Sequence, residues 1–509
     1  MRPILTAQQV RAADAHTIAH EPITSIDLME RASNACVTFM LDRLLALDRL
    51  HASAFVVVSG PGNNGGDGAA IARLLRARGF EVRLAVMQVG TLSPDRATNV
   101  ERAQQAGVEI IDLGEGQALP ALRPGEVIVD ALFGTGLSRP LDGPSADLVR
   151  AMNASGAPII CLDLPSGLFS EDNGANDLSA IVRATHTLTF EVPKLALLLA
   201  ENASFVGEFH LLHIGLDPDF ILSLKSTTGV LETSDLGPLL KPRARAGHKG
   251  DFGHALLIAG SKGMMGASIL SASAAIRSGA GLVTTHVPAS AADLIHSAVP
   301  ESLASLDPGL HHSGALPKLE KATAIGVGPG LGTERETSAL LKVLIQEARV
   351  PLVIDADALN ILGENKTWLA YLPQDTILTP HPKEFDRVFG VCANGYERLM
   401  KAREMAMKHG VCIVLKGAPS ATCDRTGQIV FNDTGNAGMA KGGSGDVLTG
   451  LITGLRAQGY TAQVSCWLGN HLHGLAGDLA AEHLGMDGMT VMDIVHALPH
   501  AWQRVRDLE

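Results

Sequence analysis

Short apolar runs alternate with helical patterns along almost the whole chain, and many of these runs lead directly into a glycine-rich loop. Continuous apolar strands separated by helices are typical of parallel sheets that are covered on both faces. The pattern therefore predicts an α/β fold. The expected strands are residues 55–58, 80–87, 127–130 and 158–163 in the first half, and 254–259, 324–327, 352–355, 376–378 and 412–415 in the second.

The alternation breaks between residues 215 and 247, where GLDPDF, a Ser/Thr-rich stretch, two prolines and the basic cluster KPRARAGHK follow one another. A complete α/β pattern restarts afterwards, and the region from residue 446 onward is mostly helical in pattern. Domains usually meet at such Pro-rich, polar connections. We expect a first domain over 1–222, a linker over 223–240 and a second domain over 241–509.

Composition narrows the class of protein. Hydrophobic residues make up 46% of the 509 residues, which excludes a disordered chain, and the formal net charge of −12 disfavours nucleic-acid binding. No apolar stretch is long enough for a signal peptide or for a membrane span of roughly 18 residues. The six cysteines form no CxxC pair, so neither a disulfide scaffold nor a zinc ribbon is expected. These features favour a cytoplasmic enzyme with reduced, mostly buried thiols.

The loop SGPGNNGGDG at residues 59–68 follows an expected strand and opens an expected helix. Ligands of open α/β sheets bind at this carboxyl edge, where glycines let the backbone approach a phosphate and helix N–H groups favour anions. The loop has neither the Walker A spacing nor GxGxxG in register. Side-chain oxygens of Asn63, Asn64 and Asp67 could hold a ribose, an amide or a monovalent cation. The alternative is a tight strand–helix turn.

Two carboxylates, Asp130 (DALFGTGLSRP) and Asp163 (DLPSG), come at the ends of further expected strands of the first half. Parallel topology converges such side chains on one crevice, although a single Asp is often only a cap or turn former. Two of them, each followed by a Gly/Ser loop, predict a site.

In the second half, the loop KGGSGDVLTG at residues 441–450 presents consecutive backbone N–H groups at a helix start. Such a loop can receive a phosphoryl group, and Asp446 there is in the position of a general base. The loop KGAPS at residues 416–420 can add a cationic and a hydroxyl contact to a nucleotide. His381 lies between two prolines in TPHPKE, and a single His in such a place is more often a loop-packing residue than a ligand contact. The pairs His16/His20 and His471/His473 are weak as metal sites.

Ordered motifs in both halves resemble one family. The first half (LTAQQVRAADAHTIAH, LMERAS, GPGNNGGDG, DALFGTGLSRP, DLPSG and FEVPK) resembles NAD(P)H-hydrate epimerases. The second half (GHKGDFGHALLIAGS, GPGLG, DADALN, TPHPKE, LKGAPS and NAGMAKGGSGDVLTG) resembles ADP-dependent NAD(P)H-hydrate dehydratases of the ribokinase-like fold. The resemblance implies a Rossmann-like three-layer domain followed by a ribokinase-like α/β domain. Ser444 and Ser420 stand where the family often has Thr, and both keep the hydroxyl.

The resemblance also implies residue roles. In the first half, Asp163 would be the catalytic acid/base, with Lys194 as a weaker candidate because a Lys after Pro is more often on the surface. Potassium would be bound by Asn64, Asp130 and Ser166. The residues lining the hydrate-binding site would be Asn63, Asn64, Gly65, Gly66, Asp67, Gly134, Thr135, Gly136, Leu137, Ser138, Arg139, Pro140 and Asp163.

In the second half, the implied catalytic residue is Asp446. The hydrate would contact Ala267, Gly328, Gly330, His381 and Asp446, and ADP or AMP would contact Lys416, Gly417, Ala418, Pro419, Ser420 and Gly445. Asp446 would take the proton of the C6 hydroxyl, which then attacks the terminal phosphate of ADP. Magnesium would neutralise the phosphates.

The resemblance implies that the first domain interconverts the R and S hydrates of NADH and NADPH. The second domain would dehydrate the S form, giving AMP and phosphate, in a tetramer or larger assembly. A ribokinase-like small-molecule kinase would carry the same glycine-rich loop, and the first half could be a binding module without catalysis. The second glycine-loop domain speaks against the kinase, and the presence of both Asp130 and Asp163 speaks against the binding module.

Overall fold

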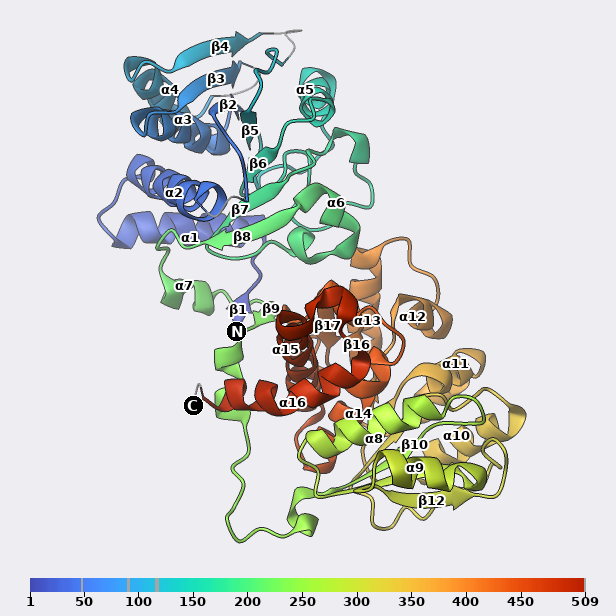
Figure 1. The fold of residues 1–509 in the computed structure, drawn as a ribbon. Helices are drawn as coiled ribbons and strands as arrows, with labels where there is room; N and C mark the ends of the chain where they lie inside the picture. Colours follow the sequence, from blue (N-terminus) through green and yellow to red (C-terminus); the bar gives the residue numbers. More distant parts are fainter. Residues whose placement is uncertain (47–48, 89–91, 115–118, 508–509) are drawn as a thin grey trace. The chain divides into compact units, whose positions relative to one another are not determined.

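The computed structural model describes residues 1–509 except 47–48, 89–91, 115–118 and 508–509. The chain divides into two compact units (Figure 1), one of residues 3–226 and one of residues 227–509 together with residues 1–2. Each unit has its own sheet. No helix in the described part of the chain has the length and the apolar character that crossing a membrane requires.

The first unit contains a seven-stranded, fully parallel sheet in the order β4-β3-β2-β5-β6-β7-β8. Its strands are β2 (Ala54–Ser59), β3 (Glu81–Met87), β4 (Glu109–Leu113), β5 (Glu126–Ala131), β6 (Ile159–Leu162), β7 (His186–Phe190) and β8 (Glu208–Leu212). Its helices are α1 (Ala7–His20), α2 (Ser25–Phe39), α3 (Asn63–Ala77), α4 (Pro94–Gln105), α5 (Gly143–Ala154), α6 (Ala203–Val206) and α7 (Pro218–Ser223).

Both faces of this sheet are covered, as the apolar runs predict. Successive side chains of a strand point to opposite faces. Phe55 and Val57 of β2 accordingly pack with α2 and α3, whereas Val56 and Val58 pack with α5. The strand order changes direction between β2 and β5, so the carboxyl ends of these two strands border the crevice where open α/β sheets bind ligands.

The second unit contains an eleven-stranded sheet in the order β1-β9-β18-β17-β16-β15-β14-β13-β10-β11-β12. Strands from β12 to β16 pair in parallel, whereas β17 is antiparallel to both β16 and β18. The strands are β1 (Arg2–Pro3), β9 (Thr228–Leu231), β10 (His254–Ile258), β11 (Leu282–Pro288), β12 (Leu303–Asp307), β13 (Ala324–Val327), β14 (Leu352–Ile354), β15 (Ile377–Leu378), β16 (Cys412–Leu415), β17 (Ser420–Cys423) and β18 (Ile429–Asn432).

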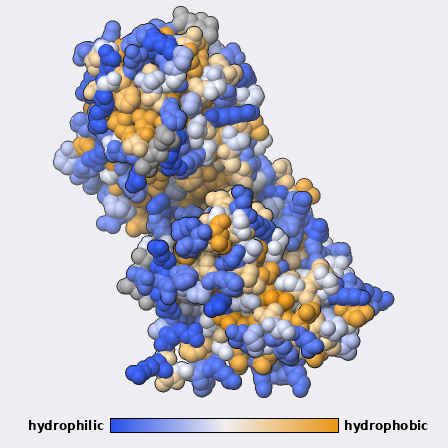
Figure 2. Space-filling view, viewed as in Figure 1, coloured by the Kyte–Doolittle hydropathy of each residue, from blue (hydrophilic) through white to orange (hydrophobic). Residues whose placement is uncertain are grey.

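Helices α8, α14, α15 and α16 form one layer of the second unit, and α10 to α13 lie in the connections between β13 and β16. The helices are α8 (Met265–Arg277), α9 (Ala292–Ala298), α10 (Arg335–Glu347), α11 (Ala356–Glu364), α12 (Pro382–Phe389), α13 (Gly395–His409), α14 (Ser444–Ala457), α15 (Ala462–Gly488) and α16 (Val491–Arg506). Hydrophilic residues predominate on the face of each unit seen in Figure 2, with apolar patches between them.

The predicted α/β fold is confirmed in both halves, and the region after residue 446 is helical as expected. One segment differs from the expected organisation. Residues 223–240 are not a free linker, because Thr228–Leu231 form β9 and pair in parallel with β18. Leu231 and Leu236 are buried in the apolar cluster of α14, α15 and α16. All six cysteines are free and buried, in agreement with the sequence analysis.

Candidate active sites

The loop after β2 is folded tightly against the end of β5. A Cβ atom on Gly60 would lie 1.8 Å from the carbonyl oxygen of Leu132, and one on Gly65 would lie 2.0 Å from that of Gly60. Only glycine fits there. Helix α3 begins at Asn63, five residues earlier than the pattern suggested, and no described side chain caps its first turn. The loop therefore offers backbone N–H groups at the carboxyl edge of the sheet.

Asp163 is the best-defined candidate catalytic residue of this unit. It follows β6 in the left-handed region (φ 65°), and its N–H donates to Leu188 O at 2.7 Å. Its Oδ1 lies 2.5 Å from Nζ of Lys194, and its Oδ2 accepts a long hydrogen bond from the Thr135 N–H at 3.4 Å. The carboxylate is thus held between the ends of β5, β6 and β7.

Lys194 is buried, not on the surface as the sequence analysis expected. Its side chain is only 1% exposed and also donates to Thr189 Oγ1 at 2.9 Å and to Phe190 O at 3.0 Å. A lysine this deeply buried needs a charged partner, which Asp163 supplies. The two residues form one ion pair, so the weaker candidate lies beside the stronger one.

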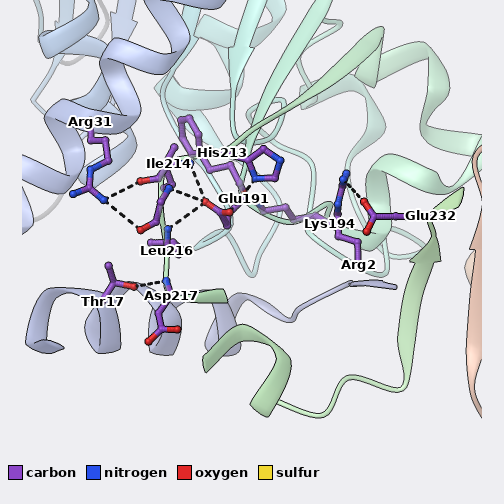
Figure 3. Close-up of polar contacts among 12 residues, drawn as sticks. Arg2, Thr17, Arg31, Glu191, Lys194, His213, Ile214, Leu216, Asp217 and Glu232 are labelled. Atoms are coloured by element: carbon purple, nitrogen blue, oxygen red, sulfur yellow. Dashed lines mark hydrogen bonds and ion pairs between the residues drawn. The ribbon is translucent and has the colours of Figure 1, made fainter. Parts of the chain in front are cut away.

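The turn that carries Lys194 is anchored by Glu191, which adopts φ 56°. Its Oε2 accepts the N–H groups of Ile214, Gly215 and Leu216, at 2.8, 3.1 and 3.3 Å (Figure 3). Arg31 of α2 donates to two carbonyl oxygens of the same loop. This network connects β7, the loop after β8 and α2 next to the Asp163–Lys194 pair, and the sequence analysis assigned it no role.

Two further carboxyl groups surround the pair. Burial, reinforced by the charge of Asp163, raises the pKa of Asp14 to about 6, and it raises that of Asp67 well above the ordinary range. Asp67 was predicted from the glycine loop, whereas Asp14 was missed. Asp14 lies on α1, and the motif LTAQQVRAADAHTIAH that contains it was the only signal.

Asp130 and Ser166, two of the residues expected to bind potassium, are hydrogen-bonded to each other. Asp130 is fully buried at the end of β5 and accepts from Ser166 N at 2.8 Å and Ser166 Oγ at 2.6 Å. Burial raises the pKa of Asp130 despite these hydrogen bonds. No Lys or Arg among the described residues forms an ion pair with it. Asn64 reaches the same region, since its side chain lies 3.5 Å from a Cβ built on Gly134, and its Nδ2 is buried without a described partner.

The remaining residues predicted around the hydrate lie farther out. Gly136, Ser138, Arg139 and Pro140 are exposed, and Leu137 packs on the apolar cluster beneath α5. Of this stretch, only Gly134 and Thr135 approach Asp163.

In the second unit, Asp446 lies in the first turn of α14. Burial, together with the charge of Asp355, raises its pKa to about 7. Ser271 of α8 holds the backbone at this point by donating to Asp446 O at 3.0 Å. A carboxylate whose pKa is near neutrality is suited to general-base catalysis.

Lys416 lies beside the start of α14, since its Nζ is 3.3 Å from a Cβ built on Gly445. It forms ion pairs with Asp355 at 2.7 Å and Glu384 at 3.5 Å. Burial acts to lower the pKa of Lys416, but the two carboxylates outweigh it and raise the pKa. Thr449 donates to the second oxygen of Asp355 at 2.6 Å. Asp355, Glu384 and Thr449 were not expected in the site, although Asp355 and Glu384 lie in the motifs DADALN and TPHPKE.

The other predicted residues of this unit occupy three places. Ala267 and Gly330 are neighbours, because a Cβ on Gly330 would lie 2.9 Å from that of Ala267, and Gly328 packs on Asp355 O. His381 caps α12, with Nδ1 accepting from Lys383 N and Glu384 N, and its ring is half exposed. Gly417, Ala418 and Pro419 form the turn into β17, which begins at Ser420.

Ser444 and the histidine pair at residues 471 and 473 were seen from the sequence without a common role. Nε2 of His473 lies 3.3 Å from Ser444 Oγ, and burial lowers the pKa of His473 to about 4. None of His16, His20, His471 and His473 belongs to a cluster of potential metal ligands in the described chain.

Two family models match the chain. One, described as "YjeF-related protein N-terminus", covers residues 25–196, and the other, described as "NAD(P)H-hydrate dehydratase", covers residues 255–500. A solved ADP/ATP-dependent NAD(P)H-hydrate dehydratase from Bacillus subtilis, co-crystallised with ATP/Mg²⁺, is 30% identical. That match covers 54% of this chain and 98% of the other, with a TM-score of 0.49.

Curated relatives match almost the whole length. The bifunctional NAD(P)H-hydrate repair enzyme of Moorella thermoacetica is 34% identical, with 99% of this chain and 97% of the relative covered. The enzyme of the same name from Escherichia coli K12 is also 34% identical, with 97% and 92% covered. The matches to these relatives therefore span both halves of the chain. The chain belongs to the family of bifunctional NAD(P)H-hydrate repair enzymes.

Proposed function

We propose that the first unit interconverts the R and S hydrates of NADH and NADPH, and that the second unit dehydrates the S form with ADP, releasing AMP and phosphate. Two acid/base sites in one chain of this family support the division of labour. The observation that carries it is Asp446, a carboxyl group with a pKa of about 7 at the start of a glycine-rich helix.

At the second site, Asp446 accepts the proton of the C6 hydroxyl, and the hydroxyl oxygen attacks the terminal phosphorus of ADP while the bond to AMP breaks. Backbone N–H groups of the 442–445 loop and the Lys416 ammonium group face the transferring phosphoryl group. The ring nitrogen then expels phosphate from C6, and loss of a proton from C5 restores the dihydronicotinamide. Phosphorylation thus converts a poor leaving group into a good one.

At the first site, Asp163 transfers the proton at the hydrated ring. Lys194 orients this carboxylate through an ion pair in which its Nζ lies 2.5 Å from Asp163 Oδ1. Glu191 acts one step away by anchoring the turn on which Lys194 stands. Asn63 to Asp67, Gly134 and Thr135 are the proposed contacts to the hydrate.

Two ions fit the side chains present. Asp130, a buried carboxylate without a described Lys or Arg partner, would hold potassium together with Ser166 Oγ and the side-chain oxygen of Asn64. Magnesium keeps several waters and is usually bound by one or two carboxylates and by substrate phosphates. Asp357 is the available carboxylate near Asp446, because Asp355 and Glu384 already bind Lys416. When bound, magnesium would neutralise the phosphates.

The test is recovery of dihydronicotinamide absorbance from a mixture of R and S hydrates with ADP in excess. Wild type should reach full recovery. Asp163→Ala should recover the S fraction and then slow to the spontaneous rate of epimerisation, and Asp446→Asn should recover neither. Transfer of phosphate to the hydrate without return of absorbance would instead indicate a small-molecule kinase. An Asp163→Ala trace that overlays wild type would support a non-catalytic binding module.

We further propose that the chain forms a tetramer or a larger assembly, as the family resemblance implies. Light scattering coupled to size-exclusion chromatography measures the mass directly. A monomer of 53.2 kDa would contradict it.

A further inference from the structure

Three side chains that the proposed chemistry does not use converge at one end of the second sheet. His286 lies on β11, Asp307 ends β12, and His312 lies in the loop after β12. Each offers a ligand atom, and these atoms all lie within 4.8 Å of one another. All three residues are at most 3% exposed. We refer to them below as the His286 cluster.

Each of the two histidines has one buried ring nitrogen that makes no hydrogen bond to a described group. His312 Nε2 lies 2.9 Å from Gly260 O, and His286 Nδ1 lies 3.0 Å from Ser305 Oγ. The opposite nitrogens, His312 Nδ1 and His286 Nε2, are buried and make no hydrogen bond to any described group. Buried polar atoms are rarely left unpaired. Histidines that bind a metal usually have this arrangement: one ring nitrogen is oriented by a hydrogen bond, and the other binds the metal.

Asp307 presents a buried charge to the same point. Its Oδ1 accepts Gly309 N at 2.8 Å and its Oδ2 accepts Ser313 Oγ at 3.0 Å, which orients the carboxylate. No Lys or Arg of the described chain forms an ion pair with it. His286 Nε2 is 3.5 Å from Asp307 Oδ2. Apart from this contact with His286, the buried carboxylate has no Lys or Arg partner among the described residues, and a bound cation would supply the missing positive charge.

We propose that His286, Asp307 and His312 bind a divalent transition-metal ion, with zinc as the best fit. Two nitrogens and one carboxylate oxygen are a donor set that zinc accepts, with water in the fourth position. Bond lengths of about 2.0–2.2 Å place tetrahedral ligand atoms about 3.3–3.6 Å apart. The pair His286 Nε2 and Asp307 Oδ2 already has that spacing, and His312 needs only a small side-chain movement.

The ion would have a structural effect near the hydrate site. It would join β11, β12 and, through the bond from His312 to Gly260, the turn after β10. The N–H of Gly260 donates in turn to Pro329 O at 2.8 Å, inside the 328–330 loop that we assign to the hydrate. Asp446 and Lys416 are not part of the cluster. The inference therefore stands whether or not the proposed reaction is correct.

A second group, formed by His186, Glu208 and His210 in the first unit, is a poorer candidate. Glu208 is exposed and already forms an ion pair with Arg49. Because the Arg49 guanidinium group already balances the charge of the Glu208 carboxylate, this group does not need a metal ion.

The experiment uses the full chain, freed of metal with a chelator and then titrated with Co²⁺, which replaces zinc and absorbs visible light when four-coordinate. Wild type should bind one more equivalent of Co²⁺ per chain than the variants His312→Gln and Asp307→Asn. Each of these variants should lose more than the roughly 10–100-fold in affinity that removal of an outer partner costs. The matched control is His254→Gln, since His254 is a half-buried histidine on β10 outside the cluster. It should titrate as wild type does.

A substitution of a ligand residue could prevent folding, so a second variant, Ser305→Ala, is tested as well. It removes only the outer hydrogen bond to His286. This variant should remain folded and bind Co²⁺ about 10–100-fold more weakly than wild type. Zinc should also raise the melting temperature of wild type and not that of Asp307→Asn. The proposal is overturned if wild type takes up no Co²⁺ at this stoichiometry, or if Ser305→Ala and the ligand variants bind as tightly as wild type.

Discussion

Asp163 and Asp446 have different charges around them. Asp163 has an ammonium group at 2.5 Å, whereas Asp446 has Asp355 as its strongest charged neighbour and no ion pair of its own among the described residues. Asp163 is therefore part of a buried ion pair, whereas burial and the charge of Asp355 raise the pKa of Asp446. The protein keeps Asp446 as a strong base near neutral pH at the cost of local stability.

Asp446→Asn should lower dehydration of the S hydrate by about 10²–10⁴-fold, because an amide cannot accept the hydroxyl proton. In wild type, kcat/KM should rise with pH up to about 7, where the carboxylate becomes deprotonated. Steady-state rates with pure S hydrate measure both. Near-normal turnover by the variant would remove Asp446 from the mechanism.

The same residue predicts a pH dependence of stability. The pKa of Asp446 is about 7 in the folded chain, against an ordinary value of 3.8 for an exposed aspartate, so the folded state binds the proton more tightly than the unfolded state. The stability from this group is fully present below pH 3.8 and is lost as the pH rises to about 7. Asp446→Asn should melt at a higher temperature than wild type at pH 8, with a smaller difference at pH 5. Equal differences at both pH values would contradict this.

Lys194→Met should destabilise the first unit by about 3–5 kcal/mol, because it leaves Asp163 buried without a partner. The double variant Lys194→Met with Asp163→Asn should recover much of that stability but not epimerisation. Urea unfolding and the R-hydrate assay measure the two effects. Arg150→Ala, at an exposed ion pair, is the control and should cost no more than about 1 kcal/mol. A Lys194→Met loss as small as the control would mean that the pair is not needed.

At the scale of elements, the position of Asp446 depends on how closely α14 packs on α8. A Cβ on Gly450 would lie 2.0 Å from the backbone oxygen of Ser271, and one on Gly454 would lie 2.0 Å from Ser278 Oγ. These glycines let the two helices approach until Ser271 can bond to Asp446 O. The helix contact, and not the loop alone, places the candidate base.

Gly450→Ala should therefore force α14 away from α8. We expect a loss of about 1–3 kcal/mol in stability, as for other overpacked interiors, and a lower dehydration rate. Gly488→Ala in α15 is the matched control, since a Cβ there meets nothing within 4 Å. It should change stability by no more than about 0.5 kcal/mol. Equal melting temperatures for the two variants would show that the helix contact tolerates a methyl group.

At the scale of the whole molecule, the division into two units lies near Ser226, which differs from the boundary predicted at residue 241. Strand β9 lies before the predicted boundary, but it belongs to the second sheet because it pairs with β18. Leu231 and Leu236 are buried there too. A second unit cut after this strand would expose the edge of β18 and an apolar patch.

A fragment beginning at Thr227 should therefore fold cooperatively and dehydrate the S hydrate while leaving the R form untouched. A fragment beginning at Lys241 should melt at a lower temperature or aggregate. Circular dichroism melts and the ADP-dependent assay compare the two. If both fragments melt at the same temperature, β9 is dispensable and the boundary near residue 241 holds after all.

The sequence by itself determined the layers, because apolar strands and the helices between them are read from neighbouring residues. It also identified the glycine loops at 59–68 and 441–450 and the carboxylates that follow them, since a strand, a loop and a helix start are local features. Only the family resemblance placed Asp130 and Ser166 in one potassium site. The structure joins the two by hydrogen bonds, and the potassium site stays a prediction.

Tertiary structure alone decided which side chains meet. Lys194, which follows β7, is buried beside Asp163, which follows β6, and Asp14 comes from a helix more than 100 residues away in the chain. Strand β9 is only four residues long, and its partner β18 is about 200 residues distant in the chain. His286, Asp307 and His312 follow no ligand motif and converge only because neighbouring parallel strands end at one edge. Long-range packing sets such contacts, and no local pattern in the sequence records them.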